Sequence, residues 1–220
     1  MKGALFDLDG VIADTAVFHF KAWRKLIKDN FDRELPDELE EKTKGVSRSD
    51  SLKVILDYLK IDLPQAEFNR LAAEKNNVYR GYLQTLTEKD ILPGMAKLIS
   101  DLKEHGVKLA LASASQNGPF ILEKLGLSEA FDAVADPTKV AKGKPAPDIY
   151  LAAADALGFK PEDCIGFEDA IAGVTAINDA HAVSIGIGSK KEVGKADFCF
   201  DKTADINYAD VKRAWENFHE

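Results

Sequence analysis

From Pro93 onward, short apolar runs alternate with helical segments, and this alternation limits the possible folds more than any other feature of the chain. The strand-like runs occupy residues 107–112, 131–134, 164–167, 182–185 and 198–200. Helical patterns follow Pro119, span 147–157 and run near 170–179. A strand–helix–strand rhythm is typical of a parallel sheet covered by helices. We therefore expect an α/β fold with a Rossmann-like parallel sheet.

The first part of the chain has a different pattern. The apolar run Ala4-Leu5-Phe6 stops at Asp7-Leu8-Asp9-Gly10, as a buried strand does when it ends in a polar turn. From Thr15 to about Leu86 the apolar residues recur at helical spacing, and no segment reads as a strong strand. We predict an α/β core domain made of residues 1–14 and 87–220, with an all-α cap domain, residues 15–86, inserted after the first strand.

The net charge of −8 comes from 29 Lys and Arg against 37 Asp and Glu. Residues 15–86 are nearly neutral, with 13 basic and 12 acidic residues, whereas the remainder holds 16 and 25. An acidic surface disfavours nucleic acid and anionic membranes as partners, because both are bound by excess Lys and Arg. It leaves small phosphorylated ligands open, since these need only a few local donors.

The cysteines and the first residues bear on location. Cys164 and Cys199 lie in apolar surroundings and are expected to be buried or half-buried thiols, since two cysteines make no disulfide framework. No stretch approaches the roughly 18 apolar residues of a membrane span. The first residues lack the long apolar region of a signal peptide. We expect a cytoplasmic protein, and a monomer.

Polar residues follow several of the predicted strands. They are Asp7 and Asp9, then Ser113, then Lys144 in the loop before Pro147, and Glu168-Asp169. Singly, each has an ordinary interpretation as a turn former, a helix cap or a solvated lysine. In an open parallel sheet, however, the carboxyl ends of the strands meet at one ligand site. Carboxylates that converge there need a cation, and their oxygens suit Mg²⁺, while a hydroxyl and a lysine would hold a phosphoryl group.

The chain resembles the haloacid dehalogenase superfamily of phosphotransferases through Asp7-Leu8-Asp9-Gly10-Val11, Ser113, Lys144-Pro145 and Glu168-Asp169. The resemblance implies that Asp7 is the nucleophile that becomes an aspartyl-phosphate and that Asp9 is the general acid/base. It also implies Mg²⁺ held by Asp7, the Asp9 carbonyl and Asp169, with Glu168 bound directly or through water. The phosphoryl oxygens would then meet Ser113, the Ala114 amide and Lys144.

Further segments resemble the hexose phosphomutases of that superfamily. They are Asp14-Thr15 with His19 and Trp23, Lys44-Gly45-Val46-Ser47-Arg48 with Asp50-Ser51, Lys75, and in the core 113–120 and 135–148. The resemblance implies interconversion of β-D-glucose 1-phosphate and glucose 6-phosphate through glucose 1,6-bisphosphate, which also serves as activator. A bisphosphate needs a second phosphate pocket, which the resemblance assigns to Arg48, Ser115 and Asn117.

The same resemblance gives the cap residues their roles. Thr15 would position Asp9 at the hinge, and the sugar would meet His19, Trp23, Gly45, Val46, Ser51 and Lys75. Each also has a structural interpretation: His19 as an ordinary helix histidine, Trp23 as cap core, Arg48 as an exposed charge at a helix start, and Lys75 as a solvated lysine.

Two positions depart from the relatives, and two other functions stay open. Gln116 stands where Lys is frequent, and Ala170 stands where Ser is frequent, which bears on substrate affinity more than on the reaction. A sugar-phosphate phosphatase on the same fold is the first alternative, distinguished by the set Arg48, His19 and Lys75. A non-catalytic interaction protein is the second, and it would have no need for matched polar residues at the strand ends.

Overall fold

The computed structural model describes residues 1–220, apart from the side chain of Glu41. Its centre is a six-stranded sheet in the order β3-β2-β1-β4-β5-β6, and every neighbouring pair is parallel. The strands are β1 (Gly3–Phe6), β2 (Lys108–Leu111), β3 (Ala133–Val134), β4 (Cys164–Glu168), β5 (Val183–Ile187) and β6 (Phe198–Phe200). The predicted parallel α/β core is confirmed, and the strand that precedes Asp7 lies in its interior.

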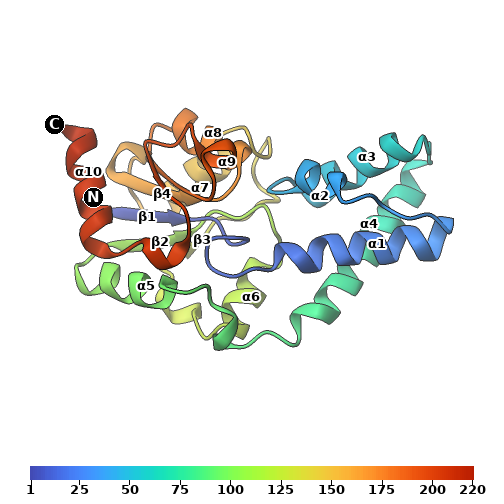
Figure 1. Cartoon of the computed structure of the whole chain (residues 1–220), viewed down its shortest axis with the longest axis horizontal. Coiled ribbons are helices and arrows are strands. Elements are labelled where there is room, and N and C mark those ends of the chain that lie inside the picture. The colour runs from blue at the N-terminus through green and yellow to red at the C-terminus, as the bar shows by residue number, and fades with distance from the viewer.

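Helices cover both faces of this sheet (Figure 1). They are α5 (Met95–Glu104), α6 (Gly118–Lys124), α7 (Asp148–Ala156), α8 (Ile171–Asp179), α9 (Lys190–Val193) and α10 (Tyr208–His219). Side chains alternate across β1, so Ala4 and Phe6 join the apolar cluster under α5 and α10, while Leu5 joins the cluster under α7 and α8. Burial on both faces explains why the strands are apolar throughout rather than alternating.

Strand β3 is shorter than the predicted run 131–134. The Asp132 carboxylate accepts a hydrogen bond from the Leu109 amide at 2.9 Å, so a side chain takes the donor that a longer ladder would use. The prediction for Cys199 was wrong: this thiol is exposed, because it lies on the edge strand β6, whereas Cys164 is buried as expected.

Residues 16–83 hold four α-helices: α1 (Ala16–Phe31), α2 (Glu38–Thr43), α3 (Arg48–Leu59) and α4 (Gln65–Leu83). They have a core of their own, in which Trp23, Leu26 and Ile27 of α1 pack with Leu52 and Ile55 of α3. Figure 1 shows this helical cap beside the sheet, at the end where the strands point. The all-helical insert agrees with the sequence, while the domain boundaries at 14/15 and 86/87 stay predictions.

The two chain segments that enter and leave the cap run together. Ala13 forms an antiparallel bridge with Ile91, and the Leu92 amide donates to the Ile12 carbonyl at 2.8 Å. Both connections therefore lie just past the carboxyl end of β1, and the cap is held over the strand ends. Among the described residues, none of the helices combines the length and apolar character needed to cross a membrane.

Candidate active site

Asp7 follows β1 directly, and Glu168 is the last residue of the neighbouring strand β4. The parallel pairing of these strands brings the two carboxylates to one edge. Gly10 makes room for a third, because its φ of +76° suits glycine and an added Cβ would collide with the Asp169 carboxylate. Gly10 therefore lets the Asp-Leu-Asp-Gly turn pass close to the side chain of Asp169, the residue that follows β4.

A buried lysine joins two of these carboxylates. Lys144 Nζ lies 2.7 Å from Asp7 Oδ1 and 2.6 Å from Glu168 Oε1, and all three residues are buried. Burial alone lowers the pKa of Lys144, but the two carboxylates outweigh it and hold that pKa above its ordinary value. Lys144 is therefore a permanent cation beside Asp7.

The Asp7 carboxyl is more costly to ionise than an ordinary aspartate. Burial raises its pKa well above the usual value, Lys144 opposes that rise, and Glu168 adds to it. An ionised Asp7 thus needs further positive charge near it.

Glu168 contacts four donors. Besides Lys144, the Tyr150 hydroxyl donates to Oε1 at 3.2 Å, and the amides of Asp169 and Ala170 donate to Oε2 at 2.8 and 3.0 Å. Gly173 in α8 leaves space for the carboxylate, since a Cβ there would collide with it. The side chain is held rigidly at the end of β4.

Asp9 faces the cap. Its Oδ1 accepts a hydrogen bond from Thr15, and its Oδ2 lies 3.9 Å from His19 Nε2. Burial raises the pKa of Asp9, while the Thr15 hydrogen bond opposes the rise. A carboxyl with a raised pKa is suited to donate and accept protons near neutral pH.

Three acidic residues form a cluster that could hold a metal ion. One carboxylate oxygen from each of Asp7, Glu168 and Asp169 lies within 4.8 Å of the others, and all three are buried. Burial and then the charge of Glu168 raise the pKa of Asp169 to about 7. Lys44 Nζ lies 2.9 Å from Asp169 Oδ2, so an ammonium group already faces the cluster. Oxygen donors that repel one another in a buried place suit a hard divalent cation.

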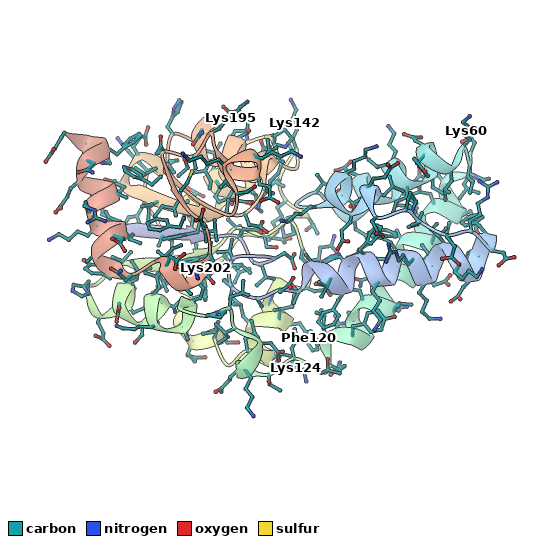
Figure 2. All side chains as sticks on the ribbon, in the orientation of Figure 1. Lys60, Phe120, Lys124, Lys142, Lys195 and Lys202 are labelled. Carbon is teal, nitrogen blue, oxygen red and sulfur yellow. The ribbon has the colours of Figure 1, made fainter. Side chains whose placement is uncertain are left out.

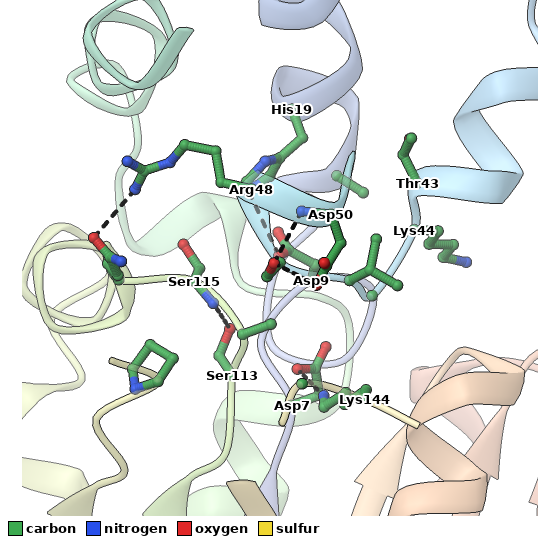
Figure 3. A pocket seen from close by; sticks show the side chains of 18 of the residues that line it. Asp7, Asp9, His19, Thr43, Lys44, Arg48, Asp50, Ser113, Ser115 and Lys144 are labelled. Carbon is green, nitrogen blue, oxygen red and sulfur yellow. Dashed lines mark hydrogen bonds and ion pairs between the residues drawn. The ribbon is translucent and has the colours of Figure 1, made fainter. Parts of the chain in front are cut away.

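The space between the cap and the strand ends is a cavity of about 500 Å³. Figure 3 shows Asp7 and Lys144 at one end, Arg48 and His19 at the other, and Asp9 between them. Arg48 Nη2 lies 3.4 Å from Gln116 Oε1, and Asn117 Nδ2 donates to Asn76 Oδ1 at 2.9 Å. These contacts join cap helices to the loop after β2, so the cap is closed over the cavity.

Most of the residues predicted for the site line this cavity. They are Asp7, Asp9, His19, Gly45, Val46, Arg48, Ser113, Ala114, Ser115, Asn117, Lys144 and Asp169. The roles assigned to them stay predictions, as does the role of the Asp9 carbonyl.

Five other predicted residues, in the part of the chain that the structure describes, lie behind the cavity wall. Thr15 contacts Asp9, and Glu168 contacts Lys144, as given above. Trp23 and Lys75 pack against each other inside the cap, with Nζ 4.6 Å from the ring centroid. Ser51 is buried and its hydroxyl lies 3.5 Å from the Thr43 carbonyl. Their predicted contact with a sugar therefore stays a prediction, and in this conformation Lys75 reaches the cavity only through His19, 2.7 Å from Nδ1.

Sequence reasoning assigned no role to four residues at the site: Lys44, Asn76, Tyr79 and Tyr150. Lys44 and Asn76 contact the core only because the cap closes, and no local pattern gives that information. Tyr79 stacks on His19 with ring centroids 3.9 Å apart. Tyr150 is the third residue of α7. Its polar hydroxyl on an otherwise apolar helix face is the sequence signal that could have pointed to a buried hydrogen bond.

Comparison with known proteins agrees with this geometry. A family model described as haloacid dehalogenase-like hydrolase matches residues 1–181. β-Phosphoglucomutase of Bacillus subtilis strain 168 is 40% identical over 220 residues, covering 99% of this chain and 97% of its own. A phosphorylated carbohydrates phosphatase of Thermotoga maritima is 29% identical over 182 residues, covering 82% of each chain.

The solved structures agree as well. The crystal structure of β-phosphoglucomutase from Clostridium difficile superposes with a TM-score of 0.97 at 38% identity, covering 100% of this chain and 99% of the other. Together with the acidic strand ends, the buried lysine and the helical cap, these matches show that the chain belongs to the haloacid dehalogenase-like hydrolase family.

Proposed function

We propose that this chain is a β-phosphoglucomutase, which interconverts β-D-glucose 1-phosphate and glucose 6-phosphate through glucose 1,6-bisphosphate. The observation that carries the proposal is one closed cavity with a place for an anion at each end. Lys144 and Ser113 lie beside Asp7, and Arg48 lies across the cavity on the side of Ser115, whose hydroxyl accepts from the Asn117 amide (Figure 3). A ligand with two phosphates fits such a site, because the planar guanidinium of arginine binds phosphate oxygens in pairs.

We propose Mg²⁺ as the resident cation. The buried oxygen cluster of Asp7, Glu168 and Asp169 fits it, and the raised pKa values of Asp7 and Asp169 indicate that the carboxylates lack enough positive charge without it. When bound, the cation would neutralise charge on the nucleophile and on the phosphoryl oxygens. The bisphosphate as activator, the monomeric state and the cytoplasmic location also remain part of the proposal.

The chain's own residues account for the transfer. Starting from the aspartyl-phosphate at Asp7, the C6 hydroxyl oxygen of β-glucose 1-phosphate attacks the phosphorus, the bond from phosphorus to Asp7 breaks, and Asp9 takes the hydroxyl proton. After the bisphosphate turns, an Asp7 carboxylate oxygen attacks the phosphorus at C1, the bond from that phosphorus to the C1 oxygen breaks, and Asp9 gives this oxygen the proton. Glucose 6-phosphate leaves and the aspartyl-phosphate is restored. Lys144 and Ser113 stabilise the negative charge of the phosphoryl oxygens throughout, which is the main source of rate in such transfers.

Closure of the cap favours a sugar over water as the acceptor. Thr15 holds Asp9 from the first turn of the cap, so the acid/base is oriented only when α1 is in its closed position. Water that reaches an open site would meet an aspartyl-phosphate without its proton acceptor in place.

The test offers β-glucose 1-phosphate and α-glucose 1-phosphate separately, with Mg²⁺ and catalytic glucose 1,6-bisphosphate. We expect glucose 6-phosphate from the β anomer alone, measured by coupled oxidation of the product. Omission of Mg²⁺ should abolish it.

The alternative function gives a different product. A sugar-phosphate phosphatase, favoured by the likeness to the Thermotoga maritima protein, would release inorganic phosphate as the main product. Release of phosphate without glucose 6-phosphate would overturn the mutase proposal.

A further inference from the structure

Tyr150 contacts both Lys144 and its partner Glu168, and no role for it has entered the mechanism above. It lies in the first turn of α7, six residues after Lys144, and its side chain is fully buried. Its hydroxyl donates to Glu168 Oε1 at 3.2 Å, and Lys144 Nζ lies 5.0 Å from its ring centroid. The ring thus packs beside the cation while the hydroxyl reaches the anion.

The Tyr150 hydroxyl acts as a donor in this contact. A buried tyrosine hydroxyl needs a partner, and this one contacts a carboxylate, which accepts only.

Four donors contact the Glu168 carboxylate, two at each oxygen. Two are backbone amides, which the fold fixes in place. The other two, Lys144 and Tyr150, share Oε1. Each donor polarises that oxygen, so the Tyr150 hydroxyl reduces the negative charge that Oε1 offers to Lys144 and to a bound cation.

Building on the function proposed above, we propose that Tyr150 is a positioning residue that sets the balance of charge at the phosphoryl end of the cavity. The positive end of its O–H dipole points at Glu168, so it makes the carboxylate cluster less negative. This favours an anion at Lys144 and disfavours a cation at Asp7 and Asp169. The two effects have opposite signs, and a general loosening of the structure would not produce that combination.

Tyr150→Phe removes only the oxygen and keeps the ring against Lys144. Tyr208→Phe is the matched control, since Tyr208 stacks on His105 at the start of α10, outside the cavity lining. Mg²⁺ is titrated calorimetrically into metal-free protein, and inorganic phosphate into the Mg²⁺-loaded protein. Melting temperatures show whether each variant is folded.

In Tyr150→Phe we expect the Kd for Mg²⁺ to fall and the Kd for phosphate to rise, each by roughly 3- to 10-fold, the size of one ordinary hydrogen bond. We expect kcat for β-glucose 1-phosphate to fall while KM changes little, because the sugar contacts other residues. Tyr208→Phe should match the native protein.

Weaker binding of both ions, or no change in either, would overturn the positioning role. The function proposed above is tested separately by the native protein: if it binds no Mg²⁺, that function fails and the role of Tyr150 fails with it. If it binds Mg²⁺ and Tyr150→Phe lacks the opposite shifts, only the role of Tyr150 is lost.

Discussion

Lys75 places an ammonium group between aromatic rings inside the cap. Its Nζ lies 4.6 and 4.7 Å from the ring centroids of Trp23 and Tyr79 and 2.7 Å from His19 Nδ1. Burial, and then the charge of Arg48, lower the pKa of Lys75 to about 7, although Asp9 opposes the shift. When Lys75 carries its proton it must donate to His19 Nδ1, which leaves the imidazole proton on Nε2, the nitrogen facing Asp9.

This shift predicts how stability depends on pH. The pKa of Lys75 is about 7 in the folded chain against an unperturbed 10.5, so between these values the unfolded chain binds more protons and stability rises with pH. The free energy of unfolding of Lys75→Met should therefore exceed that of the native protein by the largest amount below pH 7. The gain should shrink above pH 7 by up to about 1.4 kcal/mol per pH unit. Urea unfolding of both proteins from pH 5.5 to 9 measures this gain. Lys53→Met, on the exposed face of α3, is the control. A difference between Lys75→Met and the native protein that does not vary with pH would contradict the prediction.

At this scale the sequence predicted the residues that come straight after strands. Asp7, Ser113 and Glu168 could be placed together because parallel strands end at one edge. The burial of Lys75 could not be predicted, because the residues around it combine into a helical pattern that fits a solvated lysine equally well. Nor could the contact of Tyr150 with Glu168, since it depends on how deep α7 lies against the sheet.

Helix α3 carries Arg48 into the site and is bounded by different signals at its two ends. At its start, the Ser47 hydroxyl accepts from the Asp50 amide, a capping arrangement that fixes where the helix begins and where Arg48 points. At its other end, Lys60 adopts φ 56°, ψ 43°, in the left-handed region that glycine prefers. Lys60 lies at the outer tip of the cap in Figure 2.

Replacement of this strained residue should stabilise the cap. We expect Lys60→Gly to raise the free energy of unfolding by about 1 kcal/mol, because a side chain in the left-handed region costs energy that glycine does not. Gln84→Gly is the control, since Gln84 ends α4 with φ −61° and should gain nothing. Urea midpoints at unchanged slope measure both, and an equal effect at the two positions would count against a backbone origin.

The boundaries of helices and strands were predictable where polar turns or prolines interrupt apolar runs, as at Asp7 and Pro64. The boundaries were harder to predict where a side chain, rather than the backbone of a neighbouring strand, accepts a backbone hydrogen bond. Strand β3 has half of its predicted length, because the Asp132 carboxylate accepts the hydrogen bond from the Leu109 amide. The sequence Phe-Asp-Ala-Val does not show whether that amide bonds to a side chain or to the backbone of a longer strand.

At the scale of the whole molecule, polar contacts between the described residues hold the cap against the sheet. Lys44 reaches Asp169, Arg48 reaches Gln116, and Asn76 pairs with Asn117. The nearly neutral cap brings its cations to an acidic core, so the proposed far phosphate position receives the charge of Arg48 only on closure, whereas Lys144 stays beside Asp7 in the core. We propose that residues 15–86 move as one unit about the paired segments near Ala13 and Ile91.

Arg48→Ala tests this arrangement. Loss of the guanidinium removes the anion site far from Asp7, so we expect mutase turnover to fall by about 100-fold or more, the scale of a charged contact that is lost in the transition state. Hydrolysis of a small acyl phosphate, which uses only the Asp7 end, should change less than about threefold by the same reasoning. Lys53→Ala, on the same helix, should leave both rates intact. Equal losses in both reactions would mean that Arg48 does not act on a second phosphate.

The central position of β1 has a consequence for how the chain is made. The strand that precedes Asp7 emerges from the ribosome before both of its neighbours: β2 begins at Lys108 and β4 only at Cys164. The cap, whose contacts are local, can fold in the interval, whereas β1 must wait unpaired until distant segments are synthesised. The edge with the acidic cluster is therefore among the last parts of the molecule to form, and a nascent chain cannot complete that cluster before Glu168 and Asp169 have left the exit tunnel.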